Sequence, residues 1–277
     1  MFFHRESEAS RIVAKLASMT SPLLIGLFPF LNVQPLVEGL RAEPGIEVVL
    51  DLPSRIAARF RAGELDAAMV PSFEAATMGA PVLDSICVAS TGAVETVMLH
   101  HRVPLRNVRS LALDDASRTS AALARIMIAE RNDAAPSVRS MRASEAAIAD
   151  ADALLLIGDP AFTFHRDGYA ALDLGAAWFA EHGLPFVFAL MVLGARGVEE
   201  NVGAILRDAR PRGLLRASHI AHSYNSGVDP ARAERYLREV IRYDLGATEK
   251  EGLRLFYRLA QAKGLLGDVK ELRFHGI

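Results

Sequence analysis

Short, uninterrupted apolar runs alternate with amphipathic stretches along the first two thirds of the chain. Continuous rather than alternating hydrophobicity predicts strands buried on both faces, as in a parallel sheet covered by helices. The stretch SRIAARFRAG at residues 54–63 has apolar residues at helical spacing and ends at a glycine, as many helices do. The pattern therefore predicts an α/β chain. The predicted strands lie at residues 23–28, 47–52, 65–70, 86–90, 108–113 and 153–158.

From about residue 196 the pattern changes to one helix after another. The last two helical segments, at residues 229–245 and 247–266, start with an acidic or hydroxyl residue and carry Pro or Glu in the first turn. No internal repeat or glycine–serine linker marks a domain boundary. Two lobes would therefore be joined by strands, and residues 94–104 and 184–192 are long enough to cross between them.

Composition narrows the class of protein and of partner. The chain has 277 residues, of which 51% are hydrophobic and 23% charged, which is typical of a globular protein with one large domain or two lobes. The net charge is −2 and both signs are interspersed, so no basic stripe indicates nucleic acid. A small molecule is the expected partner, and the composition leaves the oligomeric state open.

The N-terminal segment and the cysteine usage indicate a cytoplasmic protein. Charges occur throughout the first fifteen residues, and no apolar core precedes a small-residue cleavage site, so we expect residues 1–21 to be an extension rather than an export signal. No run reaches the roughly 20 apolar residues that a transmembrane helix requires. The single cysteine, Cys87, excludes an internal disulfide and fits a reducing compartment.

The sequence lacks the common catalytic signatures. We find no G-x-G-x-x-G after a strand, no G-x-x-x-x-G-K-[ST], no G-x-S-x-G and no H-E-x-x-H. His219 and His222 are spaced like metal ligands on a helix but have no obvious third ligand, so no metal site is predicted. The adjacent His100 and His101 would point to opposite faces of a strand, and we interpret both as structural.

A polar cluster stands at the start of an alanine-rich helix, directly after the predicted strand at residues 108–113. It consists of Ser117, Arg118, Thr119 and Ser120. Hydroxyl residues at this boundary are the usual helix caps. The same position also suits an anion, because exposed amides and the helix dipole attract carboxylate or phosphate. From the residues alone, both interpretations remain open.

Other polar residues follow the predicted strands at their carboxyl ends, where α/β sheets place their ligands. These residues are Asn32, Ser72, Ser90, Thr91 and Asp159.

Read in order, the segments LN-x-x-P, VPS, SRTS, IGD and GLPFVFA resemble the menaquinone-biosynthesis family, specifically its MqnA branch of chorismate dehydratases. The resemblance runs from about residue 22 to the final helices. It implies a type 2 periplasmic-binding-protein fold, with two α/β lobes joined by two crossing strands around a ligand cleft and a helical C-terminal part. The implied first lobe comprises residues 22–100 and 190–277, and the second comprises residues 101–189.

The resemblance also implies the reaction and the roles of residues. Chorismate would lose water to give 3-enolpyruvylbenzoate without a cofactor or metal, as the first step of menaquinone biosynthesis by the futalosine route. Asn32 would orient the substrate or donate to developing charge, with the proton taken by the substrate's own enolpyruvyl carboxylate; alternatively, Asn32 stabilises the turn before Pro35. The cluster at residues 117–120 would bind a carboxylate of the substrate.

The remaining candidates divide between the implied lobes. Ser72, Ser90 and Thr91 would bind substrate from the first lobe, and Asp159 would either face the cleft from the second lobe or cap the next turn.

The sequence departs from the common pattern of this branch at Phe30, Val33, Glu95, Thr96, His182 and Met191. These departures leave room for an altered substrate. The first alternative is the sister MqnD branch, which forms 1,4-dihydroxy-6-naphthoate but lacks the LN-x-x-P opening. A non-catalytic binding protein for an anionic small molecule and a ligand-sensing domain of a regulator are further alternatives.

Overall fold

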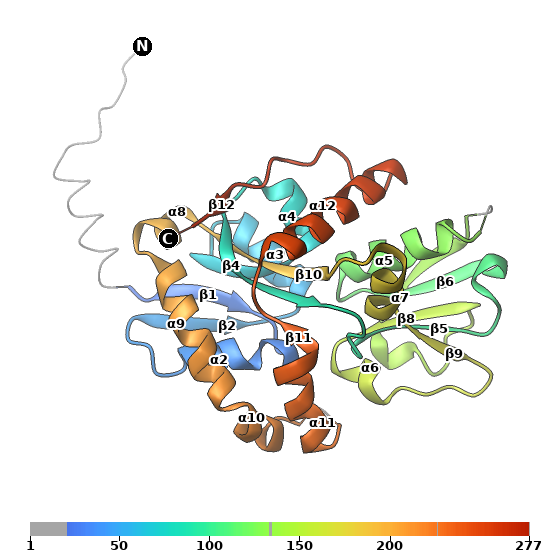
Figure 1. Ribbon diagram of the computed structural model, residues 1–277, viewed down its shortest axis with the longest axis horizontal. Helices are drawn as coiled ribbons and strands as arrows, with labels where there is room; N and C mark the ends of the chain where they lie inside the picture. The colour runs from blue at the N-terminus through green and yellow to red at the C-terminus, as the bar shows by residue number, and fades with distance from the viewer. Residues whose placement is uncertain (1–20, 133–134, 226, 277) are drawn as a thin grey trace, which may run out of the picture.

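The computed structural model describes residues 21–132, 135–225 and 227–276, and in it the chain forms two α/β lobes that lie side by side (Figure 1). Each lobe is built around its own sheet. The helical C-terminal part lies mainly against the first lobe (Figure 1). The expected N-terminal extension, residues 1–21, falls outside the described part except for its last residue.

The first lobe contains a seven-stranded sheet in the order β11-β4-β10-β3-β1-β2, with β12 paired to β4. Strand β1 is parallel to both β2 and β3, whereas β10 runs antiparallel between β3 and β4. Four of the predicted apolar runs form β1 to β4. The strands of this sheet are β1 (Leu23–Leu27), β2 (Ile46–Leu50), β3 (Ala67–Pro71), β4 (Val82–Ser90), β10 (Phe186–Leu193), β11 (Ile241–Arg242) and β12 (Phe274–His275).

The second lobe contains a five-stranded sheet in the order β7-β6-β8-β5-β9. The last two predicted apolar runs form β6 and β8, which are parallel neighbours in its centre. The sequence did not predict β7 and β9, which lie at the edges and carry mostly exposed or half-buried side chains. The strands are β5 (Val97–His101), β6 (Ser110–Asp114), β7 (Ser137–Met141), β8 (Ala153–Ile157) and β9 (Ala170–Asp173).

Helices cover both sheets. In the first lobe, α2 and α9 pack closely at two glycines. A Cβ added at Gly39 would lie 1.9 Å from the Ala209 carbonyl oxygen, and one added at Gly213 would lie 1.7 Å from the Pro35 carbonyl oxygen, so neither position has room for a side chain. Helix α12 contacts α5 of the second lobe as well as β10. The α-helices are α2 (Gln34–Leu40), α3 (Pro53–Arg61), α4 (Ser72–Met78), α5 (Arg118–Ala129), α6 (Asp159–Thr163), α7 (Leu174–His182), α8 (Ala195–Glu199), α9 (Val202–Leu215), α10 (Ala217–Ser223), α11 (Pro230–Arg235) and α12 (Ala247–Ala262).

Four shorter helical turns complete the described structure. They are η1 (Leu31–Val33), η2 (Leu105–Asn107), η3 (Ala143–Glu145) and the π-helical η4 (Tyr236–Val240).

The chain crosses between the lobes twice, between β4 and β5 and between α7 and β10. Strand β5 pairs only within the second sheet and β10 only within the first, so each change of lobe lies a few residues before the expected boundaries at 100/101 and 189/190. A strand must complete its hydrogen-bond ladder with one sheet, and the crossing therefore falls in the segments just before these strands. At the first crossing, the Asp173 carboxylate accepts hydrogen bonds from the Val94 and Glu95 N–H groups.

A single apolar cluster runs through both lobes and includes Leu27, Leu155 and Trp178. A second, smaller cluster around Leu154 and Leu156 covers the other face of the second sheet. Among the described helices, none is both long and apolar enough to cross a membrane.

Candidate active site

A small cavity, partly open to solvent, lies between the two lobes. It is lined from both sheets, and most of its wall is apolar, with aromatic rings at Phe28, Phe30 and Phe188. No Lys, Arg, Asp or Glu side chain from the described ranges lines it. Its polar side chains are Asn32, Thr96, Ser117 and Ser120.

Asn32 projects from η1, the turn that follows β1 in the first lobe. Its Oδ1 atom is buried and has no hydrogen-bond partner within the described residues. Burying an amide oxygen without a partner costs free energy, so such an atom in a cavity wall is suited to accept a hydrogen bond from a ligand.

The Tyr236 hydroxyl lies beside the Asn32 side chain and is itself held in place. It lies 2.9 Å from Oγ1 of Thr96, and Thr96 Oγ1 donates to the Val94 carbonyl at 3.3 Å. Because Thr96 gives its only proton to Val94, Tyr236 donates to Thr96. Burial raises the pKa of Tyr236 well above its usual range, so the phenol keeps its proton. In the Asn32 amide, Oδ1 is the buried atom without a partner among the described residues.

The start of α5 forms the facing wall in the second lobe. Ser117 Oγ accepts hydrogen bonds from the Ser120 N–H and the Ser120 hydroxyl, both at 3.3 Å, so Ser117 caps the helix as its sequence position predicts. Since Ser117 Oγ accepts twice, its own proton remains available to donate. The two interpretations left open by the sequence are compatible, because the same two serines cap the helix and line the cavity.

Arg118 and Thr119 face away from this cavity and join the two lobes. The Arg118 guanidinium lies 2.9 Å from the buried carboxylate of Glu74 and stacks 5.0 Å from the centre of the Phe73 ring. Thr119 Oγ1 accepts a hydrogen bond from the Phe73 N–H at 3.0 Å. Glu74 is also paired with Arg61, so its charge is compensated from both lobes.

Three candidates of the first lobe do not line the cavity. Ser72 is fully buried and donates to the Val187 carbonyl at 2.7 Å. Ser90 donates to the Gly92 carbonyl at 3.0 Å, and Thr91 is exposed. All three lie where the predicted strands end, but local and cross-sheet partners take up the two serine hydroxyls.

Asp159, the first residue of α6, also lies outside the cavity lining. Its Oδ1 accepts the Leu31 N–H at 3.2 Å, and its Oδ2 lies 2.5 Å from the Tyr224 hydroxyl. Burial raises the pKa of Asp159 above its ordinary value, while these two hydrogen bonds oppose the shift. Asp159 thus connects the second lobe to the turn that carries Asn32.

Comparison with known proteins identifies the family of this chain. Residues 23–262 match the family model described as menaquinone biosynthesis. This chain belongs to the menaquinone biosynthesis family. A curated chorismate dehydratase of Thermus thermophilus is 30% identical to this family member over 272 residues, which cover 88% of this chain and 96% of the relative.

Solved structures show the fold of this family member. Protein AF1704 from Archaeoglobus fulgidus superposes with a TM-score of 0.74 at 16% identity, covering 89% of this chain and 99% of that one. The periplasmic aliphatic sulphonate binding protein SsuA from Escherichia coli superposes with a TM-score of 0.58 at 14% identity, covering 90% and 95%. The predicted periplasmic-binding-protein-like fold is therefore confirmed.

Two of the departures from the MqnA pattern touch the cavity of this family member. Phe30 lines it beside Asn32, and Thr96 lines it beside Tyr236. The other four do not line it, and three of them are explained by their surroundings: Val33 and Met191 are buried, and the His182 ring packs 4.2 Å from that of Trp178. Glu95 pairs with two arginines of α11, Arg232 and Arg235.

Sequence reasoning did not identify Tyr224 and Tyr236 as neighbours of the Asn32 turn in this family member. Both come from the C-terminal helical part, and no local pattern distinguishes them from core tyrosines. The polar residue Thr96 carried a signal, because it departs from the family pattern next to a crossing strand.

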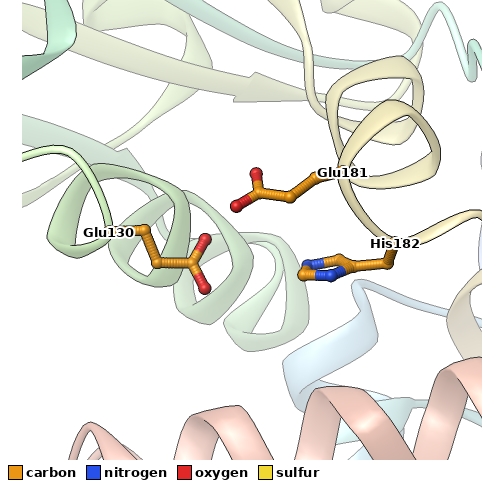
Figure 2. Close-up of side chains that lie close together, drawn as sticks. All are labelled: Glu130, Glu181 and His182. Carbon is orange, nitrogen blue, oxygen red and sulfur yellow. The ribbon is translucent and has the colours of Figure 1, made fainter.

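Glu130, Glu181 and His182 form a second group of ionisable side chains, which point toward one another from the ends of α5 and α7 (Figure 2). One potential ligand atom of each lies within 4.8 Å of the others. Arg131 already binds the Glu181 carboxylate at 2.7 Å. Burial and a hydrogen bond to Glu181 raise the pKa of Glu130. None of the three lines the cavity.

Proposed function

We propose that this protein is a chorismate dehydratase, a hydro-lyase that converts chorismate to 3-enolpyruvylbenzoate and water. The observation that carries the proposal is the free Asn32 Oδ1 in the cavity wall, opposite the serine-capped start of α5. The name of the Thermus thermophilus relative supports the same reaction.

The reaction needs a site that binds two carboxylates and assists the loss of a ring hydroxyl. Loss of one ring proton and the hydroxyl makes the ring aromatic, and the atoms removed together form one water molecule. The elimination is redox-neutral, so it requires no electron acceptor. The protein must hold the reacting groups in line and stabilise charge that develops on the ring carboxylate.

The α5 start would bind a carboxylate of the substrate. The Ser117 hydroxyl has its proton free, and first-turn N–H groups and the helix dipole favour an anion at this end. A hydrogen bond to a charged group contributes about 1.5–3 kcal/mol. Because the described cavity wall has no cationic side chain, neutral donors of this kind would provide most of the carboxylate recognition.

Asn32 would orient the substrate. Its buried Oδ1 has no partner among the described residues, which suits acceptance of a hydrogen bond from the ring hydroxyl. An amide is a poor general base, so the proton would pass to the substrate's own enolpyruvyl carboxylate. Asn32 then contributes by positioning rather than by proton transfer.

We further place the reaction at the first step of menaquinone biosynthesis by the futalosine route, in the cytoplasm. Membership of the menaquinone biosynthesis family supports the pathway. The single cysteine, Cys87, is a buried free thiol, which fits a reducing compartment. Chorismate, a small dicarboxylate, is the partner we propose; neither nucleic acid nor a membrane has a place in this reaction.

The test is to incubate the purified protein with chorismate alone and to follow absorbance and mass. We expect an aromatic product lighter than chorismate by one water, and no such product with Asn32→Ala under the same conditions. Tight binding without turnover would instead indicate a binding protein. Neither binding nor turnover would direct the assay to the cyclic futalosine substrate of the MqnD branch.

A further inference from the structure

Three successive residues before Asn32 are held by groups from distant parts of the chain. The Pro29 carbonyl accepts a hydrogen bond from the Tyr224 hydroxyl at 2.5 Å. The Phe30 ring packs on Gly158, where an added Cβ would lie 3.0 Å from the ring. The Leu31 N–H donates to Asp159 Oδ1 at 3.2 Å. The backbone that leads into Asn32 is therefore held from outside as well as by its own turn, in which the Val33 N–H donates to the Phe30 carbonyl at 3.1 Å.

Asp159 and Tyr224 act on this turn as a connected pair. The Tyr224 hydroxyl has one proton but lies 2.5 Å from both Asp159 Oδ2 and the Pro29 carbonyl oxygen. A neutral Asp159 satisfies every group, because it donates to Tyr224 while Tyr224 donates to Pro29 and Oδ1 still accepts from Leu31. An ionised Asp159 keeps the Leu31 bond and shares the tyrosine proton. Both protonation states hold the turn at Pro29 and at Leu31.

The pair also connects the two lobes. Asp159 follows β8 of the second sheet, whereas Leu31 follows β1 of the first, and the two residues are 128 positions apart in the sequence. Separation of the lobes would break the hydrogen bond from the Leu31 N–H to Asp159. The position of the Asn32 turn is thus linked to closure of the lobes around the cavity.

We propose that Asp159 and Tyr224 are positioning residues that bring the Asn32 amide to its working position when the lobes close. The proposal rests on the proposed function, since it assigns Asn32 to the substrate. Neither residue lines the cavity, so both act through the turn at residues 29–32 rather than on the substrate. Their loss should slow turnover of bound substrate more than it weakens binding.

Steady-state kinetics of matched variants provide the first test. We expect Asp159→Ala to lower kcat about tenfold or more with less than about threefold change in KM, and Tyr224→Phe to lower kcat by a smaller factor. Asp159→Asn keeps an acceptor for Leu31 and a donor for Tyr224, so it should retain kcat within about threefold. Asp66→Ala is the control, because Asp66 accepts the Leu24 N–H at the other end of β1.

A double-mutant cycle separates action through Asn32 from a general loss of structure. In an Asn32→Ala background, adding Asp159→Ala should change kcat by less than about twofold, because the residue that it positions is already gone. Independent losses that multiply would overturn the proposal. The same cycle with Tyr224→Phe covers the case in which Asp159→Ala does not fold.

Hydrogen exchange tests the proposal without any substrate. In Asp159→Ala and Tyr224→Phe, a peptide covering residues 28–34 should exchange its amide hydrogens faster than in the wild type, while Asp66→Ala should leave that peptide unchanged. Unchanged exchange in both pair variants would overturn the proposal. If the wild type does not turn over chorismate but the exchange result holds, the proposed function fails and the link between the pair and the turn stands.

Discussion

The two walls of the cavity are built in opposite ways. The α5 start is held by its own neighbours, since Ser117 accepts from the N–H and hydroxyl of Ser120, three residues further on. The Asn32 turn has no side-chain cap of its own. Instead, Asp159 and Tyr224 form hydrogen bonds with the backbone at Leu31 and Pro29. One wall is therefore local in sequence and the other depends on the assembled fold.

This difference matters for how each wall responds to change. The capped helix start depends on contacts within α5, so its geometry does not require the other lobe. The turn before Asn32 is held across the lobes, so its position depends on how the lobes are arranged. The comparison predicts that changes at the α5 wall affect binding and changes at the Asn32 wall affect turnover.

Asn32→Ala should have the largest effect. We expect kcat to fall by about 10² or more, because the variant removes the amide whose unpartnered oxygen lies in the cavity wall. The fold should persist, since Oδ1 has no partner to lose among the described residues. Steady-state kinetics with chorismate and a thermal melt measure the two effects.

The exposed amide variant Asn107→Ala is the control and should behave as wild type. Near-normal kcat in Asn32→Ala would show that Asn32 takes no part in the mechanism, and would contradict the prediction that changes at its wall of the cavity affect turnover.

The next effect is a pH dependence of stability at the α5 wall. Asp114 ends β6 just before the helix, and burial raises its pKa from 3.8 to about 6, even though its carboxylate accepts the N–H groups of Ala116 and Ile157. Because the folded state holds the proton more tightly, this stabilisation is complete below about pH 4 and is lost as pH rises to about 6. Asp114→Asn does not titrate. The wild type should therefore lose about 2 kcal/mol of unfolding free energy relative to Asp114→Asn between pH 4.5 and 7.

Urea unfolding at several pH values measures this difference. Asp115→Asn is the matched control, because the neighbouring carboxylate is exposed. A difference between the wild type and Asp114→Asn that stays constant with pH would contradict the assigned shift.

The double variant Ser117→Ala/Ser120→Ala tests the binding role of the α5 wall. We expect KM to rise about tenfold with little change in kcat, because a charge-assisted hydrogen bond of about 1.5 kcal/mol is lost in both the ground and transition states. Loss of the cap should also cost about 1 kcal/mol of stability. Isothermal titration with chorismate in an Asn32→Ala background reports binding without turnover.

Asp229→Ala controls for the lost cap, because Asp229 caps α11 and lies outside the cavity lining. An unchanged KM in the serine variant would place the carboxylate elsewhere.

Arg118→Ala should have the smallest effect. Its ion pair with Glu74 joins the lobes, but the Arg118 side chain is 62% exposed, so the pair is worth less than about 1 kcal/mol. We expect a KM increase of no more than a few-fold, since Thr119 still bonds to Phe73 across the lobes. Arg55→Ala, which breaks an exposed pair with Asp51 inside one lobe, is the control. A tenfold loss in kcat would show that the Arg118–Glu74 contact affects turnover, and would contradict the prediction that changes at the α5 wall affect binding.

The sequence predicted the central strands of both sheets and the edge strand β2 of the first sheet, but not β7 and β9 at the edges of the second. Central strands such as β3 and β8 are buried on both faces and so appear as continuous apolar runs. Edge strands β7 and β9 carry exposed side chains, and their pairing on one side alone leaves no apolar signature. The segments predicted to cross, residues 94–104 and 184–192, mostly form β5 and β10, each of which pairs within one sheet, and the crossings fall just before them.

The candidate site was only partly visible in the sequence. The strand ends pointed to several residues, of which Asn32 was predicted to be catalytic and Ser72, Ser90, Thr91 and Asp159 to bind substrate. Asn32 lines the cavity, while Ser72 donates to Val187, 115 residues away in sequence. The order of strands in the sheet places a polar residue that follows a strand near the cleft. Its rotamer and its hydrogen-bond partner, however, depend on residues that are distant in the sequence.

The sequence by itself determined the capped start of α5 and the α/β order of elements, because caps and hydrophobic periodicity act over a few residues. The tertiary structure alone decided that Arg118 and Thr119 join the lobes and that Asp159 holds the turn before Asn32. Those contacts connect residues from 44 to 128 positions apart, and their hydrogen bonds exist only once both lobes have folded and closed. The sequence thus determined which hydrogen-bonding groups each residue carries and its local secondary structure, and the tertiary packing decided which partners those groups contact.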